Sequence, residues 1–262
     1  MKNTLAVFFI TLTLVCCKQR SKLVWSDEFN VEGIPDSTHW GYDTGSGCPS
    51  ICGWGNNEAQ YYTQLAKNVR IQNGLLIIEA HKDSIGGKAY TSARIVSKHK
   101  GDWLYGRIEV KAKIPKGKGT WPAIWMLPTD WKYGGWPTSG EIDIMEHVGY
   151  DRGVIHGTLH SKKYNHILQT QQEGKIIIYD CSDIFHVYAV NWEKDKIDFF
   201  VDDKLYHTVK RNPEDNFEGW PFDQKFHLIM NISVGGNWGG KEGIDDSIWP
   251  QRMEVDYVRV YQ

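Results

Sequence analysis

Residues 107–114, with the sequence RIEVKAKI, alternate strictly between apolar and charged side chains. The apolar positions share one side of an extended chain, and they are Ile108, Val110, Ala112 and Ile114. A period of two residues is that of a β-strand with one face in a core and the other in water. The segment therefore predicts a half-buried β-strand.

Further strand-length runs rich in β-branched and aromatic residues recur along the chain. They cover residues 75–80, 140–146, 186–192, 196–201, 205–209, 226–234 and 254–261. The polar residues 202–204 separate two of these runs and predict a hairpin turn. Many short strands divided by turns predict an all-β fold, and this length favours a two-sheet jelly roll.

The net charge and the aromatic content of the chain limit the classes of molecule that it could bind. The chain has 262 residues, with 30 Lys and Arg against 32 Asp and Glu, so its formal net charge is -2. This balance gives no electrostatic footprint for nucleic acid or an anionic membrane, and we expect a neutral partner. The 12 Trp and 13 Tyr suit both a β-sandwich core and a cleft that stacks on flat sugar faces.

The first 17 residues have the proportions of a secretory signal and are too short for a spanning helix. Their apolar run ends at Cys16 and Cys17, and a polar stretch follows, which resembles a bacterial lipoprotein site with Cys17, or alternatively Cys16, lipidated. We expect a signal peptide over residues 1–17 and an exported domain over 18–262, with membrane contact only through the anchor. A plain cleaved signal is the alternative.

Beyond the signal only Cys48, Cys52 and Cys181 remain. An odd count is no disulfide framework, and the spacing is not that of a zinc site. Cys48 and Cys52 lie in the turn-rich segment GSGCPSICGWG, where they are either bridged in an oxidising compartment or free.

Three acids lie close together in the segment GEIDIMEHVGY, residues 140–150. In a regular strand Glu141 and Asp143 share a face, whereas Glu146 falls on the opposite one. One extra residue, in a β-bulge around Met145, would return Glu146 to the face of the other two. We therefore predict a bulge that brings the three carboxylates together.

Three like charges on one face raise at least one pKa, which is typical of groups kept for chemistry. Retaining glycoside hydrolysis needs two carboxyl groups about 5–5.5 Å apart, one as nucleophile and one as acid and then base. A calcium site or a solvated acidic face is the alternative on spacing alone. The segment GTWPAIWMLP just upstream favours the catalytic reading, because Trp121 and Trp125 could project onto one surface as stacking platforms.

These residues resemble glycoside hydrolase family 16, whose signature E-[ILV]-D-x-x-E matches Glu141, Asp143 and Glu146. Similar segments run through the chain, namely VWSDEFN, GWGNNEAQYYT, TSARI, WPAIWMLP, NISVGGNWGG and EVDYVRVY. The resemblance implies a β-jelly-roll sandwich of two antiparallel sheets with a concave substrate cleft. It also implies that Glu141 is the nucleophile, Asp143 the assisting carboxylate and Glu146 the acid/base.

The longer spacing of this signature resembles that of laminarinases, agarases and carrageenases. The segments WPAIWMLP, GEIDIMEHVGY and NISVGGNWGG together look most like laminarinases, which act on internal bonds of β-1,3-glucan with some tolerance for mixed β-1,3-1,4 linkages. By the same resemblance, the cleft residues that contact glucosyl units are Asn57, Arg94, Trp121, Trp125, Trp136, His160 and, as a further candidate, Trp238. A core role for Trp121 and Trp125 and a surface salt bridge for Arg94 are the alternatives. We do not expect His156 and His160 to form a metal pair.

Family resemblance also implies a structural calcium ion away from the cleft, held by Glu28, the backbone oxygen of Gly74 and Asp256, for which plain surface acids are the alternative. We expect no cofactor for catalysis, a β-glucan polysaccharide or oligosaccharide as partner, and a monomer. Three other functions stay open: a hydrolase of agar- or carrageenan-type galactan, a transglycosylase, and a non-catalytic carbohydrate-binding jelly roll.

Overall fold

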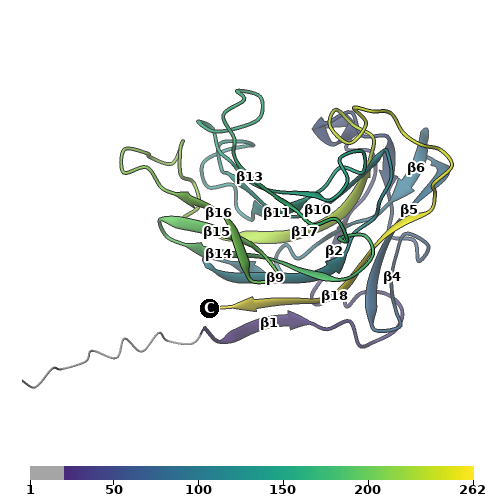
Figure 1. The fold of residues 1–262 in the computed structure, drawn as a ribbon, viewed down its shortest axis with the longest axis horizontal. Helices are drawn as coiled ribbons and strands as arrows, with labels where there is room; N and C mark the ends of the chain where they lie inside the picture. The colour runs from purple at the N-terminus through teal and green to yellow at the C-terminus, as the bar shows by residue number, and fades with distance from the viewer. Residues whose placement is uncertain (1–20) are drawn as a thin grey trace, which may run out of the picture.

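A computed structural model describes residues 21–262 of the chain. The proposed signal over residues 1–17 lies outside the described residues. Almost all regular structure is β-strand, and the strands form two sheets that face each other across one core (Figure 1). Among residues 21–262, no helix is long and apolar enough to cross a membrane.

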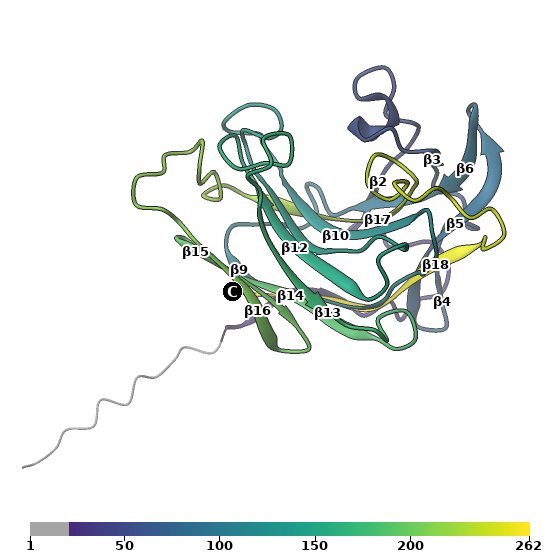
Figure 2. The same cartoon turned by 45° about the horizontal axis from the view of Figure 1, so that its top comes forward.

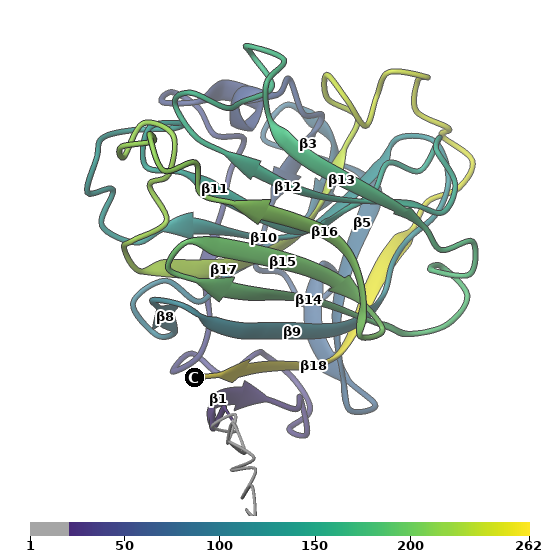
Figure 3. The ribbon, with the colours of Figure 1, turned by 60° about the vertical axis from the view of Figure 1, so that its left-hand side comes forward.

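The larger sheet has ten strands, and its outer face is turned to the viewer in Figure 3. Its order is β16 (Lys204–Lys210), β15 (Lys196–Val201), β14 (His186–Glu193), β9 (Gly106–Lys113), β18 (Gln251–Tyr261), β5 (Leu75–Ile85), β6 (Lys88–Ser92) and β3 (Gln60–Tyr62). Two more strands pair at its side, β1 (Leu23–Asp27) with β18 and β4 (Val69–Gln72) with β5.

The second sheet has eight strands and carries the candidate site. Its order is β13 (Gln172–Ile177), β12 (Val154–His160), β11 (Glu141–Glu146), β10 (Thr120–Pro128), β17 (Phe226–Val234), β7 (Arg94–Val96) and β2 (Gly41–Asp43), with β8 (Asp102–Trp103) paired to β17. The strands bend upward, and loops rise beyond their ends (Figures 1 and 2). One short 3₁₀ turn, η1 (Cys52–Gly55), lies in such a loop.

The strand predicted over residues 107–114 is β9, and its alternation is the reason for its place in the sandwich. Ile108, Val110 and Ala112 are fully buried between the sheets, whereas the charged residues between them are partly exposed. Burial of an Ile or Val side chain contributes roughly 1.5–3 kcal/mol to folding. The other predicted runs are also strands, each within two residues of the expected start except β18, which begins at Gln251.

The jelly-roll prediction is confirmed, with one difference in strand direction. β3 pairs with β6 in parallel, whereas every other strand pair is antiparallel in the part of the chain that the structure describes. The predicted hairpin turn joins β15 to β16 at Asp202 and Asp203, which have φ values of 49° and 62°. Two successive positive φ angles give the turn a twist that matches the flanking strands.

Candidate active site

The predicted bulge is present in β11. Asp143 pairs with Trp125 of β10, but Met145 pairs with the adjacent Ile124, so Ile144 is an additional residue in the strand. The register with β12 shifts between the same two acids, Asp143 and Glu146. The extra residue restores the alternation that a regular strand would have lost.

Cross-strand pairing puts a polar row on one face of β11 and β12. Glu141 lies opposite His160, Asp143 opposite Thr158, and Glu146 opposite His156. The residues between them on β12 are buried in the core. The row is therefore the cleft face of this part of the sheet.

A tryptophan holds each outer carboxylate of the row. The indole Nε1 of Trp136 donates a hydrogen bond to Oε2 of Glu141 over 2.8 Å. The indole Nε1 of Trp121 donates to Oε1 of Glu146 over 3.0 Å. His160 lies under the centre of the row, with Nε2 3.3 Å from Oδ2 of Asp143. These contacts fix the side chains on either side of the position where a sugar would react.

Burial raises the pKa of all three acids. The pKa of Glu141 and the pKa of Asp143 lie well above their usual ranges, and the negative charge of a neighbouring acid adds to the effect of burial for each. The pKa of Glu146 is also raised by burial, against the lowering effects of His160 and of the Trp121 hydrogen bond. Because close like charges oppose full ionisation, the group retains a proton that an acid step can use.

A cavity of about 450 Å³ lies at the acids. Its lining includes all three acids with Arg94, Trp121, Trp125 and Trp136 of the predicted cleft residues. As expected, Trp121 and Trp125 project from β10 onto one surface. Both contribute to the cleft and not to the core, since each is only partly buried. An aromatic, open groove of this kind suits a chain of flat sugar rings.

Arg94 lies between two tryptophans at one part of this cavity. Its guanidinium carbon is 4.7 Å from the ring centroid of Trp54 and 4.7 Å from that of Trp125. Its Nε is also 3.0 Å from Oδ2 of Asp43. A cleft position and a salt bridge were alternatives for Arg94, and the structure shows both, since Arg94 lines the cavity and pairs with Asp43.

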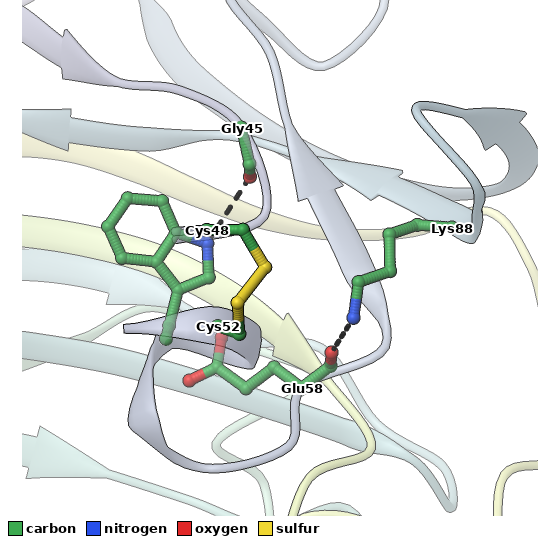
Figure 4. Close-up of a disulfide and its surroundings, with 6 residues drawn as sticks. Gly45, Cys48, Cys52, Glu58 and Lys88 are labelled. Atoms are coloured by element: carbon green, nitrogen blue, oxygen red, sulfur yellow. Dashed lines mark hydrogen bonds between the residues drawn. A yellow bond between two sulfur atoms is a disulfide. The ribbon is translucent and has the colours of Figure 1, made fainter. Parts of the chain in front are cut away.

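Cys48 and Cys52 form a disulfide, which decides between the two states left open by the sequence. The bridge joins Cys48 to the first residue of η1 (Figure 4), and Trp54 follows two residues later in the same turn. The indole of Trp54 donates to the backbone oxygen of Gly45 over 3.2 Å, so the loop is held at a second point. Cys181 is free and buried.

Three other predicted residues lie around the cavity but not in its lining. Asn57 donates its amide to Oδ1 of Asn237 over 2.8 Å. Trp238 packs edge-on against Trp121, with 5.4 Å between ring centroids. His160 lies beside Asp143, beneath the cleft surface.

The two histidines of β12 contact different acids. Nδ1 of His156 lies 2.6 Å from Oε1 of Glu173, whereas His160 faces Asp143. Among the described residues, one acid and histidine group has its ligand atoms close together, within 4.8 Å, and it consists of Glu141, Asp143 and His160. It overlaps the row of three acids.

The three predicted calcium ligands lie near one another in the sheet register. Asp27 pairs with Val258, so Glu28 follows β1 near Asp256. The register of β18 shifts at Asp256, and because the preceding Val255 pairs with Leu76, Gly74 just before β5 lies near the same point. Two carboxylates and a carbonyl are donors of the type that calcium prefers. Both carboxylates already have basic partners, however, since Glu28 accepts two hydrogen bonds from Arg259 and Asp256 lies 2.7 Å from Lys111.

Sequence reasoning missed several polar residues of the cleft. Asn231 and Ser233 line the cavity from β17, and Asn231 accepts a hydrogen bond from Trp125 over 2.7 Å. Both alternate with buried apolar residues, so the two-residue period contained this signal. Glu58 also lines the cavity, and burial raises its pKa. Its position in the segment GWGNNEAQYYT gave no indication of burial.

The chain is similar to known proteins over most of its length. It is 52% identical over 248 residues to a beta-glucanase of Rhodothermus marinus, covering 92% of this chain and 85% of that protein. Among solved structures it resembles the laminarinase from Rhodothermus marinus, with a TM-score of 0.89, 52% identity and coverage of 92% and 97%. A solved non-specific endo-beta-1,3(4)-glucanase from family GH16 has a TM-score of 0.87, 45% identity and coverage of 93% and 92%. The pattern of the glycosyl hydrolases family 16 matches residues 56–259, and the chain belongs to that family.

Proposed function

We propose that the protein is a retaining hydrolase of internal β-1,3-glucosidic bonds in laminarin-type β-glucans, with activity on mixed β-1,3-1,4-glucan. The observation that carries the proposal is the bulge in β11, which puts Glu141 and Glu146 on one face of an aromatic groove with Asp143 between them. Retaining glycosidases use two carboxyl groups in this way and need no cofactor.

In the first step, a carboxylate oxygen of Glu141 attacks the anomeric carbon and the glycosidic bond breaks. Glu146 gives its proton to the departing oxygen and becomes a carboxylate. The indole of Trp121, which already donates to Glu146, stabilises the charge that forms. Asp143 keeps a proton near the nucleophile, because ionisation of all three acids at once is unfavourable.

In the second step, water attacks the same anomeric carbon from the side that the leaving group vacated. Glu146, now a base, takes the proton of that water, and the bond between Glu141 and the sugar breaks. Two inversions at one carbon give retention of configuration. Glu141 leaves the sugar as a carboxylate, and the hydrogen bond from the indole of Trp136 stabilises that carboxylate.

A neutral glucan suits the groove better than a sulfated galactan. Sulfate groups call for free Arg or Lys side chains in the cleft. Of the basic residues that line the cavity, Arg94 is already paired with Asp43, which leaves Lys98. Names of the similar proteins, laminarinase and endo-beta-1,3(4)-glucanase, support the same substrate class.

Incubation with laminarin, lichenan, agarose and carrageenan, followed by oligosaccharide profiling, tests the substrate. We expect internal cleavage of laminarin, slower cleavage of lichenan and no galactan products. Glu141→Ser should abolish release of reducing ends and retain glucan binding. Equal absence of activity in the wild type and in Glu141→Ser would instead indicate a binding module. Added acceptor sugars distinguish transglycosylation, since the products would then be longer than the substrate.

A structural calcium ion at Glu28, Gly74 and Asp256 is part of the proposal. Binding would require the two carboxylates to leave Arg259 and Lys111, so we expect weak affinity. Millimolar calcium should raise the Tm of the wild type and leave that of Glu28→Gln/Asp256→Asn unchanged. The same Tm in calcium and in EDTA would contradict the site.

Export and lipid anchoring are also proposed, on the basis of the sequence of residues 1–17 alone. Labelled palmitate should enter the wild-type protein in a bacterial host, and Cys17→Ala should abolish this whereas Cys16→Ala should not. We further propose a monomer. Light scattering of the protein without its signal should give a mass for one chain.

A further inference from the structure

A buried pair beside the proposed acid/base has no part in the mechanism above. His156 of β12 is 3% exposed and stands directly across from Glu146 in the strand register. Its Nδ1 lies 2.6 Å from Oε1 of Glu173 in the neighbouring strand β13. An ionised carboxylate only accepts hydrogen bonds, so Nδ1 carries a proton and donates it to Glu173.

The other nitrogen of the ring, Nε2 of His156, is buried and has no hydrogen-bond partner. Such an atom calls for an explanation, because buried polar groups are nearly always paired. The ring is perpendicular to that of Trp238, with centroids 4.8 Å apart, and Trp238 packs in turn on Trp121. Since Trp121 donates to Glu146, His156 is fixed in the same packed group as that carboxylate.

We propose that His156, oriented by Glu173, is a positioning residue for Glu146 and that its protonated form stabilises the carboxylate left after Glu146 has protonated the departing sugar. The inference rests on the proposed function. His156 transfers no proton in this scheme. The proton on the departing oxygen comes from Glu146, and Glu146 later regains one from water.

Charged and titratable groups face His156 from both neighbouring strands. They are Glu146 and His147 at the end of β11, Glu173 and Lys175 on β13, and His160 on its own strand. The hydrogen bond from His156 lowers the pKa of Glu173, so Glu173 is ionised at neutral pH and places its negative charge against Nδ1 of His156. On Glu146 the two partners act in opposite directions, since the charge of His156 lowers its pKa and that of Glu173 raises it.

These opposite signs make the proposal testable by pH profiles of kcat/KM on laminarin. The basic limb of such a profile reports the acid of the free enzyme, here Glu146. His156→Phe should move that limb to higher pH by about one unit. Glu173→Gln should also move the basic limb to higher pH, but by less. When Glu173→Gln is added to His156→Phe, the limb should move no further to higher pH. Lys175→Gln, which removes an exposed charge from the same strand, is the matched control and should leave the limb in place.

A second substrate separates positioning from a merely structural role. An aryl glucoside with a very acidic phenol needs no proton from Glu146, so His156→Phe should lose rate on laminarin at least tenfold more than on the aryl substrate. Equal losses on both substrates would overturn the proposal. A basic limb that stays at the wild-type pH, or that moves to lower pH in Glu173→Gln, would overturn it as well.

Two controls keep the outcome clear. If His156→Phe does not fold, His156→Gln keeps a donor for Glu173 without the charge and should show the same limb shift. Wild-type hydrolysis of laminarin is measured alongside. Its absence would reject the proposed function itself, whereas an active wild type with unmoved limbs in the variants would reject only the role of His156.

Discussion

Trp121 donates its indole hydrogen to Oε1 of Glu146 over 3.0 Å, so a residue of the groove wall directly contacts the proposed acid/base. The bond favours the charged form of the carboxylate, and it opposes the burial that raises the pKa of Glu146. At the other end of the row Trp136 has the same relation to Glu141. Each indole therefore contacts a different one of the two carboxyls proposed to be catalytic.

Trp121→Phe should move the basic limb of the pH profile of kcat/KM to higher pH. The variant loses a hydrogen bond to a charged group, worth about 1.5–3 kcal/mol, and 1.36 kcal/mol corresponds to one pKa unit. We expect a shift of about one unit with laminarin as substrate and an unchanged acidic limb. A shift of the acidic limb alone would mean that Glu146 is the nucleophile.

Trp136→Phe should move the acidic limb to higher pH by a similar amount. Glu141 must be ionised to attack, and without the indole its carboxylate is less stable, so ionisation needs a higher pH. The same initial-rate assay measures both tryptophan variants. Identical profiles for the two would show that their contacts with the carboxylates do not control the reaction.

Asp143→Asn should stabilise the protein at neutral pH while it lowers activity. Burial and the charge of Glu146 raise the pKa of Asp143 in the folded state. The folded chain therefore binds more protons than the unfolded chain above about pH 3.9, and stability falls as pH rises from there through the folded pKa. Asn at this position does not ionise, so the variant does not lose stability as pH rises. Its Tm should exceed that of the wild type at pH 8, and the two Tm values should be equal near pH 4.

Each 1 kcal/mol of this difference corresponds to about 2–4 °C in Tm for a chain of this size. Asp36→Asn provides a control of opposite sign, because hydrogen bonds from Thr38 lower the pKa of Asp36. Calorimetry at several pH values gives the comparison. A Tm difference for Asp143→Asn that is constant with pH would rule out titration of this carboxyl as its cause.

Cys48→Ser/Cys52→Ser should raise KM for laminarin more than it lowers kcat, by roughly tenfold in KM. The disulfide ends two residues before Trp54, whose ring lies against the guanidinium of Arg94 in the cavity wall. A reductant should produce the same change in the wild type and none in the double variant. An unchanged KM in both tests would show that the loop keeps its place without the bridge.

The sequence predicted the sheets because they follow from the two-residue period, and it predicted the acid row because Glu146 breaks that period and one extra residue restores it. Pairing between distant strands was harder to foresee. β13 is partly exposed and has no clear alternation, so nothing in its sequence indicated that Glu173 would meet His156. The parallel pairing of β3 with β6 and the ion pair of Arg94 with Asp43 likewise depend on where loops return in space.

The side chains of Ile144 and Met145 are both buried, at 1% and 0% exposure, so the bulge also adds to the interior. Deletion of one of them would place Glu141, Asp143 and Glu146 at alternate positions, so a regular strand without a bulge would keep all three on one face. The groove would keep its three carboxylates, whereas the interior would lose a large aliphatic group at a cost of about 2–5 kcal/mol. Removal of one residue from β11 at this point is therefore compatible with the placement of the three carboxylates. Its cost depends on how well the side chains around the bulge repack to fill the cavity.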